Sequence, residues 1–339
     1  MIFYMGTDLG KRTIGYCCSP DMRDPWTLLK HVQLATQAGF KAIWVSDHFH
    51  PFFDTNAHEY STLVWMSAAL ERVKQIPFGT SVIAPILRYH PAIIAQAFGT
   101  MELMFGRRVI LGVGSGEALN EVPLGFRWPS PKERREMLVE AVGIIRKLWT
   151  GDFVSFSGKY YTLSKAKLYM SSSVPIYISA YGPRTAELVG MIGDGFITEK
   201  PLDYVERSLF PQLRKGAISV GRTIDQITKV LDFNVSYGSD YEKALDSVRS
   251  WGGGFFPSTF ISPVCDPREL EAMSKTISDE TLANTYLVGD SIEEHIRRIE
   301  NAFKIGFDHV QVFNASSAEE SFIEAYRNKI IPYFHDGKN

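Results

Sequence analysis

Short apolar runs alternate with amphipathic segments from one end of this chain to the other, and this rhythm constrains the fold more than any other feature. Each run is followed by a segment with helical spacing, and such a strand–helix rhythm is typical of parallel sheets. The eight runs that we predict as strands are Thr13–Cys18, Ala42–Ser46, Ile76–Ile83, Val109–Gly114, Ile176–Ala180, Gly195–Thr198, Lys229–Gly238 and His309–Asn314.

The segments between these runs carry helix start and stop signals. The first helix is expected to begin near Pro25 and to end at Gly39, and a long helix is expected to begin after Ser130, its predicted N-cap. Pro211 predicts a break within the helix after the sixth strand, because proline lacks a backbone N–H. The stretch "DFVSFSGKYYTL" alternates like a hairpin around residues 157 and 158.

Eight strand–helix units in 339 residues predict a (β/α)8 barrel, which we place in a single domain over residues 1–339. A doubly wound open sheet is the alternative. That fold would carry a glycine-rich fingerprint after its first strand, and "YCCSPDMRDP" is not one. Glycines and prolines between Gly252 and Pro267 predict a late, irregular insertion at about residues 252–276.

Composition limits the partners and the compartment. The 36 Lys and Arg residues nearly balance the 38 Asp and Glu residues, so neither nucleic acid nor a membrane is expected as a partner. Only three cysteines occur and two are adjacent, which predicts a reducing setting rather than a disulfide framework. The N-terminus, with Met5 as an alternative start to Met1, lacks a signal-peptide layout, and no apolar run is long enough to span a bilayer. These features predict a soluble, cytoplasmic protein.

In a barrel, functional side chains gather where the strands end and the following loops begin. "WVSDHFHPFF" lies after the second predicted strand, "GSGEALNE" after the fourth, "AYGPR" after the fifth and "TEKP" after the sixth. Any single polar loop is explained by its contact with water. Several such loops on one rim predict a site for binding or catalysis.

The first of these loops holds two alternating histidines, His48 and His50, next to Asp47. On an extended segment the two imidazoles point the same way and Asp47 points oppositely. A shared metal would need a further ligand, and no Cys/His cluster supplies one, so no metal is predicted. We expect His48 to handle a proton together with Glu117, and His50 to be a rim residue.

Two further loops suit a flat or anionic ligand. Glycines at alternate positions of "GVGSGEALNE" (residues 112–121) allow close approach to the backbone, although the third glycine of the dinucleotide fingerprint is absent. Glu117 and Asn120 of this loop offer an acid and an amide to the edge of a heterocycle. Gly182 and Pro183 open a helix whose free N–H groups suit an anionic tail.

With these segments the chain resembles the coenzyme F420-dependent branch of the bacterial luciferase-like superfamily. The similarity spans about Thr13 to Phe334, and within that branch it is greatest to the alcohol and glucose-6-phosphate dehydrogenases. Its most specific segments are "WVSDHFHP", "GTSVIAPILRYHPAIIAQAFGTM", "RVILGVGSGEALNEVPLG", "SGKYYTL" and "IGDGFIT". The resemblance implies a luciferase-like TIM barrel, commonly a homodimer, that binds F420 with its deazaflavin ring in the barrel mouth.

The resemblance also implies roles for individual residues. The family's active-site histidine falls on His48 and its ring-facing glutamate on Glu117. A non-proline cis peptide behind the ring is implied at Ser81–Val82. Phe49, Phe52 and Trp65, with Lys200, are expected to line the substrate pocket. Cofactor contacts are implied for Asp47, Ser81, Val82, Gly116, Asn120, Ser179, Ala180, Tyr181 and Gly182.

Two departures from the family pattern concern the substrate. Phe52 stands where the dehydrogenases usually have Trp, and a phenyl ring cannot donate an indole N–H. The three cations that bind the sugar phosphate in the glucose-6-phosphate enzymes are replaced here by Ser208, Ala272 and Thr285. Without these cations a sugar phosphate is disfavoured as the substrate unless Lys200 or Lys275 substitutes.

The predicted reaction is a reversible hydride transfer between a carbinol carbon and C5 of the deazaflavin, with a small or unphosphorylated substrate favoured. His48 would lie at the substrate oxygen, as base or as hydrogen-bonding orienter, and Glu117 at the N1 side of the ring. The alternatives are an F420-dependent glucose-6-phosphate dehydrogenase, an FMN-dependent monooxygenase, a pterin reductase and a non-catalytic F420 carrier.

Overall fold

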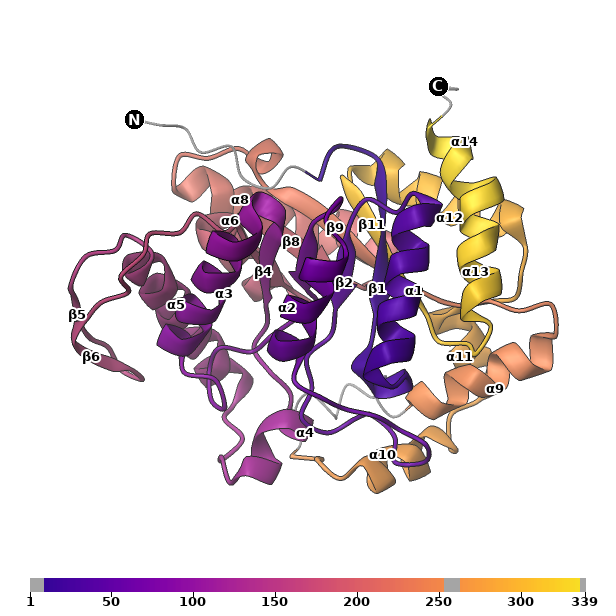
Figure 1. Cartoon of the computed structure of the whole chain (residues 1–339), viewed down its shortest axis with the longest axis horizontal. Helices are drawn as coiled ribbons and strands as arrows, with labels where there is room; N and C mark the ends of the chain where they lie inside the picture. The colour runs from indigo at the N-terminus through magenta and orange to yellow at the C-terminus, as the bar shows by residue number, and fades with distance from the viewer. Residues whose placement is uncertain (1–8, 253–262, 336–339) are drawn as a thin grey trace.

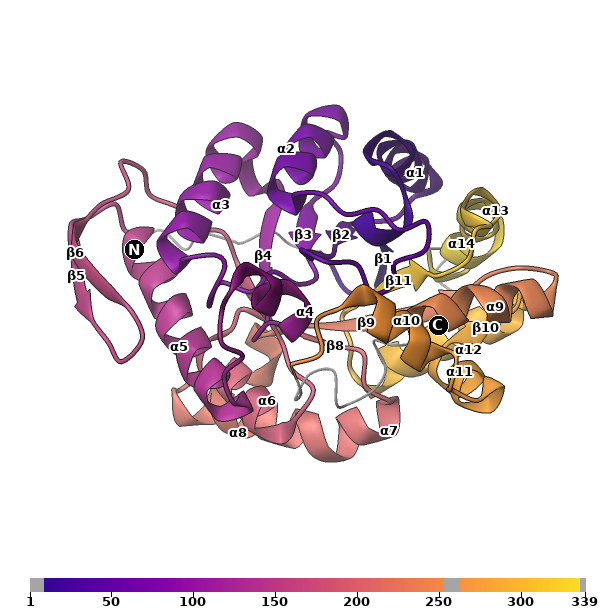
Figure 2. The ribbon, with the colours of Figure 1, turned by 90° about the horizontal axis from the view of Figure 1, so that it is seen from below.

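The structure is a computed structural model and describes residues 9–252 and 263–335. Its centre is a closed barrel of parallel strands, in the order β9-β11-β1-β2-β3-β4-β7-β8, in which β8 pairs with β9 to complete the ring (Figures 1 and 2). The predicted (β/α)8 barrel is therefore confirmed. Its strands are β1 (Thr13–Cys18), β2 (Ile43–Val45), β3 (Phe78–Thr80), β4 (Val109–Val113), β7 (Ile176–Ser179), β8 (Gly195–Thr198), β9 (Thr228–Ser236) and β11 (His309–Asn314).

Helices surround the barrel and cover the outer faces of its strands (Figure 2). Their inward faces are apolar and pack on the outward side chains of the strands, which forms the larger part of the core. These helices are α1 (Pro25–Ala38), α2 (Thr62–Arg72), α3 (Pro91–Phe105), α5 (Pro131–Leu148), α6 (Pro183–Ile192), α8 (Phe210–Ser219), α9 (Tyr241–Trp251), α12 (Ile292–Ile305), α13 (Glu319–Ala325) and α14 (Ile331–His335).

The predicted helix boundaries follow from local capping. The Asp24 side chain accepts hydrogen bonds from the first two free backbone N–H groups of α1, and Gly39 ends that helix in the left-handed conformation, with a φ of 100°. Ser130 caps α5 as predicted and forms a reciprocal capping box with Glu133.

The break predicted at Pro211 takes the form of a change in helix type. A short α7 (Leu202–Tyr204) continues into a π-helical turn at Val205–Leu209, and α8 starts directly after it. Proline cannot donate to the preceding turn, so wider π-type bonding just before it lets the chain continue in the same direction.

Two segments lie outside the alternating pattern. The predicted hairpin forms from β5 (Val154–Ser157) and β6 (Thr162–Ala166), which pair antiparallel at one edge of the molecule (Figure 1). Residues 253–262 of the predicted insertion lie outside the described residues. The chain after them forms α10 (Pro267–Ser274) and α11 (Asp279–Thr285), and β10 (Leu287–Val288) then pairs in parallel with the end of β9.

Alternate side chains of each strand fill the barrel interior. The indole N–H of Trp44 donates to Nε2 of His309 over 3.0 Å, and the Trp44 and Tyr177 rings lie 5.9 Å apart. A methyl group at Gly79 would come within 2.6 Å of the Trp44 ring, so glycine makes room for the indole. The same alternation, continued past the end of β2, points His48 into the barrel mouth.

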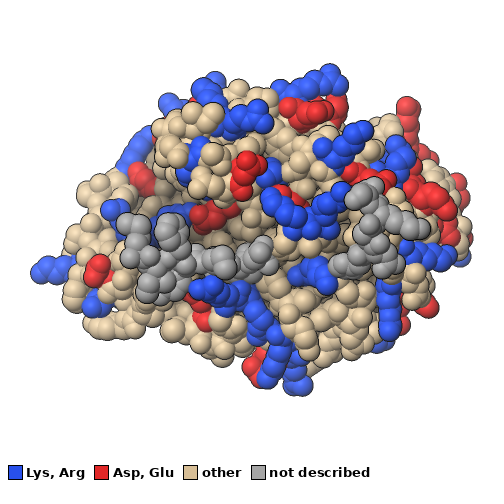
Figure 3. Space-filling model, turned by 90° about the horizontal axis from the view of Figure 1, so that it is seen from above, with Lys and Arg blue, Asp and Glu red and all other residues tan. Residues whose placement is uncertain are grey.

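The mouth opens on the side of the short helix α4 (Ala118–Glu121) and of α10, which Figure 2 faces. On the opposite end, shown in Figure 3, lysines and arginines are spread among acidic side chains. Lys11–Asp308 and Arg146–Asp194 ion pairs neutralise part of this charge. Within the described residues no helix has both the length and the apolar character needed to cross a membrane.

Candidate active site

Two cavities meet at the barrel mouth. The first, here called the aromatic cavity, has a volume of about 130 Å³ and is lined by Cys17, Ser19, Ser46, His48, Phe52, Ser81, Glu117, Tyr181, Glu199, Asp232, Asn234, Trp251, Tyr286 and Phe313. The second, here called the glycine cleft, has a volume of about 470 Å³ and is lined by Asp47, His48, Ser81, Val82, Ala84, Gly114, Ser115, Gly116, Glu117, Asn120, Pro131, Arg134, Arg135, Ser179, Tyr181, Gly182 and Thr185. His48, Ser81, Glu117 and Tyr181 line both and form the boundary between them.

The predicted cofactor residues come together in the glycine cleft. Asp47, Ser81, Val82, Gly116, Asn120, Ser179, Tyr181 and Gly182 all line it, and Ala180 is buried between two of them. The cis peptide bond predicted at Ser81–Val82 is present. The predicted cofactor residues come from the end of β7 and from the four loops after β2, β3, β4 and β7, and together they form one wall of the cleft.

Of the four residues predicted to line the substrate pocket, one, Phe52, lines a cavity at the barrel mouth. Phe52 lines the aromatic cavity, and its ring lies 4.9 Å from the imidazole of His48 in an edge-on arrangement. Lys200 lines neither cavity; its Nζ lies 4.7 Å from the ring centroid of Tyr181. Phe49 is exposed, stacks on His50 and lines neither cavity, so that expectation was wrong.

Trp65 does not reach the mouth, and its assignment to the substrate pocket was wrong. It lies on α2, and its indole N–H donates to the carbonyl oxygen of Pro25 on α1 over 2.9 Å. Side chains of the outer helices pack on each other and on the outside of the barrel. The two cavities are lined by strand ends, by the loops after them and by residues of α5, α6 and α9, whereas α2 contributes none to either.

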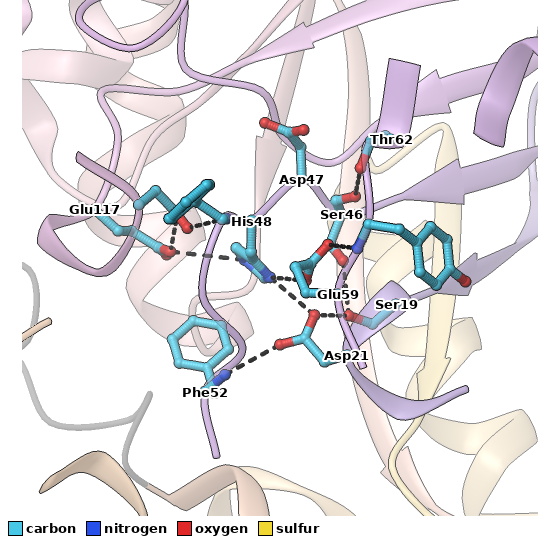
Figure 4. Close-up of polar contacts among 12 residues, drawn as sticks. Ser19, Asp21, Ser46, Asp47, His48, Phe52, Glu59, Thr62 and Glu117 are labelled. Atoms are coloured by element: carbon cyan, nitrogen blue, oxygen red, sulfur yellow. Dashed lines mark hydrogen bonds and ion pairs between the residues drawn. The ribbon is translucent and has the colours of Figure 1, made fainter. Parts of the chain in front are cut away.

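His48 is held among three carboxyl groups (Figure 4). Its Nδ1 lies 3.0 Å from Asp21 Oδ1 and 4.0 Å from Glu59 Oε2, and its Nε2 lies 3.6 Å from Glu117 Oε2. Burial disfavours the charged imidazole, but Asp21, Glu117 and Glu59 outweigh it and raise the pKa of His48 to about 10. At neutral pH His48 is therefore an imidazolium, which suits a hydrogen-bond donor to an oxygen rather than a free base.

Asp21, which the sequence analysis did not single out, fixes the orientation of His48. It lies in a 3-10 turn, Pro20–Met22, directly after β1. Its Oδ1 accepts from Ser19 Oγ at 2.7 Å, and its Oδ2 accepts from the backbone N–H of Phe52 at 3.1 Å. Burial alone would raise the pKa of Asp21, but His48 and these hydrogen bonds lower it, so the carboxylate stays ionised.

Glu59 is the second carboxyl that the sequence analysis did not single out. Burial, followed by the neighbouring charge of Asp21, raises the pKa of Glu59 to about 9. The two acids therefore differ at neutral pH, with Asp21 ionised and Glu59 protonated. Ligand atoms of Asp21, His48 and Glu59 lie within 4.8 Å of one another, a spacing also seen at metal sites. Here hydrogen bonds already use both oxygens of Asp21.

Asp47, next to His48 in sequence, points away from it. Its carboxylate forms an ion pair with Arg88, and the side chains of Asp47 and Arg88 are only 1% and 7% exposed. Arg88 also lies 3.8 Å from Glu121, and its backbone N–H donates to Glu121 at 2.8 Å. This network fixes the loop after β3 to α4 and leaves His48 as the inward-facing member of the pair.

The far part of the glycine cleft is basic. Arg134 and Arg135 line it, and Arg134 donates to the carbonyl oxygen of Gly116 over 3.2 Å. The first turn of α6 follows Gly182, where a side chain would meet no atom within 4 Å. The open backbone at a helix start and two guanidinium groups together favour an anionic tail. Arg184, in the same first turn of α6, is exposed and does not line the cleft.

Comparison with known proteins places this barrel in a family. Residues 14–309 match the family described as luciferase-like monooxygenase, and the chain belongs to it. The F420-dependent glucose-6-phosphate dehydrogenase of Beutenbergia cavernae is 38% identical over 323 residues, which cover 94% of this chain and 96% of that protein. The protein of the same name from Mycobacterium tuberculosis is 36% identical, with coverage of 94% and 97%.

Two solved structures that resemble this chain are also F420-dependent enzymes by name. An F420-dependent secondary alcohol dehydrogenase in complex with an F420–acetone adduct matches with a TM-score of 0.91 and 36% identity, over 95% of this chain and 98% of that one. The F420-dependent tetrahydromethanopterin reductase of Methanopyrus kandleri matches with a TM-score of 0.76 at 23% identity, which supports the fold alone.

Proposed function

We propose that this protein is an F420-dependent oxidoreductase that transfers a hydride between a carbinol carbon and C5 of the deazaflavin. The observation that carries the proposal is the position of His48 and Glu117 on the boundary between the two cavities. A cofactor in one cavity and a substrate in the other would meet at these two side chains. The relatives named above, at 36–38% identity over nearly the whole chain, are F420-dependent by name.

The glycine cleft fits the cofactor. Its volume of about 470 Å³ is within the usual range for small-molecule sites, and it has glycines along its walls and arginines at its far part. Asp47, Ser81–Val82, Gly116, Asn120 and Ser179–Gly182 would hold the ring side, with Arg134 and Arg135 toward an anionic tail. The bound deazaflavin supplies the hydride acceptor or donor.

The chain's own residues control the substrate oxygen and its proton. The His48 imidazolium donates a hydrogen bond to that oxygen and stabilises negative charge on it, while Asp21 holds the ring in place. Glu117, next to His48 and lining both cavities, takes the hydroxyl proton when the alcohol is oxidised. Burial raises the pKa of Glu117, and nearby His48 opposes the rise.

A small, unphosphorylated substrate is proposed over glucose 6-phosphate. Among the described residues that line the aromatic cavity none is a lysine or arginine, whereas Glu117, Glu199 and Asp232 are acids. Lys275, which was considered as a substitute cation, is exposed directly after the end of α10, and its Nζ lies 3.7 Å from Glu271 Oε1. A phosphate dianion would therefore meet carboxyl groups instead of partners.

Anaerobic mixing with F420 tests the proposal. We expect 2-propanol or a related secondary alcohol to reduce the cofactor, followed by its visible absorbance, and glucose 6-phosphate to react far more slowly. Titration with F420 and with FMN separates the proposed enzyme from an FMN-dependent monooxygenase. Absence of F420 binding, or binding with no turnover of any alcohol or carbonyl compound, refutes the dehydrogenase.

We also propose a homodimer, supported by an apolar groove on the outside of α1 and α2. Trp26 and Val64 are 75% and 72% exposed there. The groove has a volume of about 320 Å³ and is lined by Pro25, Trp26, Leu29, Tyr60, Ser61, Val64, Trp65, Ala68 and Ala69. Light scattering on the native chain and on Val64→Glu tests it. A monomeric native chain refutes it.

A cytoplasmic location is proposed from the free cysteines Cys17, Cys18 and Cys265.

A further inference from the structure

One part of the aromatic cavity is not used by the reaction just described. Three of its polar side chains, Glu199, Asp232 and Asn234, come from β9 and from the loop after β8. In the strand order of the barrel, β8 lies four positions from β2, on the opposite side of the ring. These groups therefore face the cavity from the side across from His48.

The backbone alternation fixes which of these groups point inward. Val230 belongs to the interior cluster that includes Trp44 and Tyr177, so Asp232 and Asn234, two and four residues later on β9, point into the barrel as well. The amide of Asn234 donates to Glu199 Oε2 over 3.4 Å, and the hydroxyl of Tyr181 is hydrogen-bonded to the same carboxylate.

One carboxyl oxygen of Asp232 is available for a further hydrogen bond. Asp232 is hydrogen-bonded to Gln311, whose amide N–H also donates to Ser81 Oγ over 2.7 Å. Its Oδ1 is shielded from solvent and has no hydrogen-bond partner within residues 9–252 and 263–335. A buried oxygen of this kind costs free energy unless a ligand or water satisfies it.

Another part of the cavity wall is aromatic. Phe52, Trp251 and Phe313 form a continuous run, with ring centroids 6.1 Å apart for Phe52 and Trp251 and 4.9 Å apart for Trp251 and Phe313. Aromatic faces pack well on the C–H groups of a carbon skeleton, while carboxyl and amide groups hold hydroxyls in fixed directions.

We infer that the substrate is a neutral polyol or unphosphorylated sugar, with its reacting carbinol at His48 and a second hydroxyl bound by Asp232, Glu199 and Asn234. This inference rests on the proposed function and specifies its substrate class. In the reaction, carbon loses its hydrogen with the electron pair to C5 of F420. The hydroxyl proton passes to Glu117 and the C–O bond becomes a carbonyl, so the substrate is oxidised and F420 is reduced by two electrons.

The protonation of the far wall agrees with a hydroxyl as the ligand. Burial, followed by the charge of Glu199, raises the pKa of Asp232 to about 8. A protonated carboxyl beside an acidic neighbour both donates and accepts, which matches a hydroxyl group. The acidic side chains of this wall would repel a phosphate. An ammonium group would be bound best by two ionised carboxylates, whereas Asp232 is protonated.

The test compares substrates matched in skeleton, using F420 and the full chain under anaerobic conditions. The pairs are 2-propanol with glycerol, 2-butanol with 2,3-butanediol, and glucose 6-phosphate with glucose. Each added hydrogen bond to this wall is expected to raise kcat/KM about tenfold or more. We expect the hydroxyl-rich or unphosphorylated member of every pair to be preferred.

Variants show which side chains produce the preference for the hydroxyl-rich substrate of each pair. In Asp232→Ala the ratio of kcat/KM for 2,3-butanediol to that for 2-butanol should fall toward 1, and in Asn234→Ala it should fall partway. The exposed control Asp152→Asn should keep the native ratio. If Asp232→Ala does not fold, the substrate pairs on the native chain and Asn234→Ala still decide.

The outcomes separate this inference from the proposed function. Turnover of simple alcohols at or above the rate of their polyol partners overturns the inference and leaves the dehydrogenase standing. A preference for amino alcohols or for glucose 6-phosphate also overturns it. Failure to bind F420, or to oxidise or reduce any compound of the panel with it, overturns the proposed function itself.

Discussion

Replacing Glu59 with Gln removes one titrating proton from the carboxyl–imidazole cluster and little else. The pKa of Glu59 is raised to about 9 in the folded protein, whereas an unfolded Glu titrates near ~4.3. Between these values the folded state binds one proton more than the unfolded state. The free energy of unfolding must therefore fall as pH rises across that window, by about 1.4 kcal/mol per pH unit.

His48 acts in the same direction. Its pKa is raised to about 10 when folded, so its stabilising contribution is complete below its unfolded pKa of ~6.5 and is lost as pH rises toward 10. Both groups take up a proton on folding between pH ~6.5 and ~8.5, and their slopes add to about 2.7 kcal/mol per pH unit. Glu59→Gln should reduce the native slope by about 1.4 kcal/mol per pH unit. Its Gln resembles the protonated Glu in shape, so stability at pH 6.5 should change little.

Urea unfolding followed by circular dichroism at pH 6.5, 7.5 and 8.5 measures both slopes. Glu133→Gln is the matched control. The pKa of Glu133 is lowered to about 2 by Arg127 and Ser130, so its titration lies well below this pH window and the slope should stay native. Equal slopes for the native chain and Glu59→Gln would refute the reasoning, since Glu59 would then be ionised in the fold.

Three further substitutions test other contacts by the same unfolding assay. Arg88→Met leaves the Asp47 carboxylate buried without its cation and should cost about 3–5 kcal/mol, seen as a lower urea midpoint. Gly112→Ala places a methyl group 1.8 Å from a backbone oxygen of β3 and should cost more than about 3 kcal/mol, whereas Gly143→Ala, in open space on α5, should be neutral or stabilising. Burial lowers the pKa of His309 to about 3, so the contribution of this imidazole to the free energy of unfolding should fall as pH drops below ~6.5; His309→Gln should remove that contribution, and a slope below pH 6 equal to that of the native chain contradicts it.

The strands and helices could be predicted because their signals are local. Asp24 and Ser130 mark helix starts within a few residues of themselves, and Gly39 marks a helix end. Strand alternation likewise predicted that Asp47 and His48 point to opposite sides, which the Arg88 ion pair on Asp47 confirms. No long-range information is needed for any of these.

The residues that were missed depend on contacts between segments. Asp21 meets His48 because β1 and β2 are neighbours in the barrel, although 27 positions separate the two residues along the chain. Glu59 reaches the same imidazole from the loop before α2. An acid after a strand is a common feature of sequences, and only the register of neighbouring strands decides whether it meets a histidine. The assignment of Trp65 to the substrate pocket was wrong for a related reason. The aromatic character of a residue does not show which layer of the barrel its side chain packs into.

The cluster around His48 also bears on the direction in which protons move. Asp47 is fixed to Arg88 and contributes no free charge to the mouth, whereas Asp21 and Glu117 keep His48 charged. A group with a pKa of about 10 stays protonated whether the substrate is an alcohol or a carbonyl compound. In the proposed reaction the exchangeable proton then belongs to Glu117, whose pKa is raised by burial while His48 opposes the rise. Hydride transfer could thus run either way without recharging the histidine, and the fixed imidazolium would stabilise the oxygen in both directions.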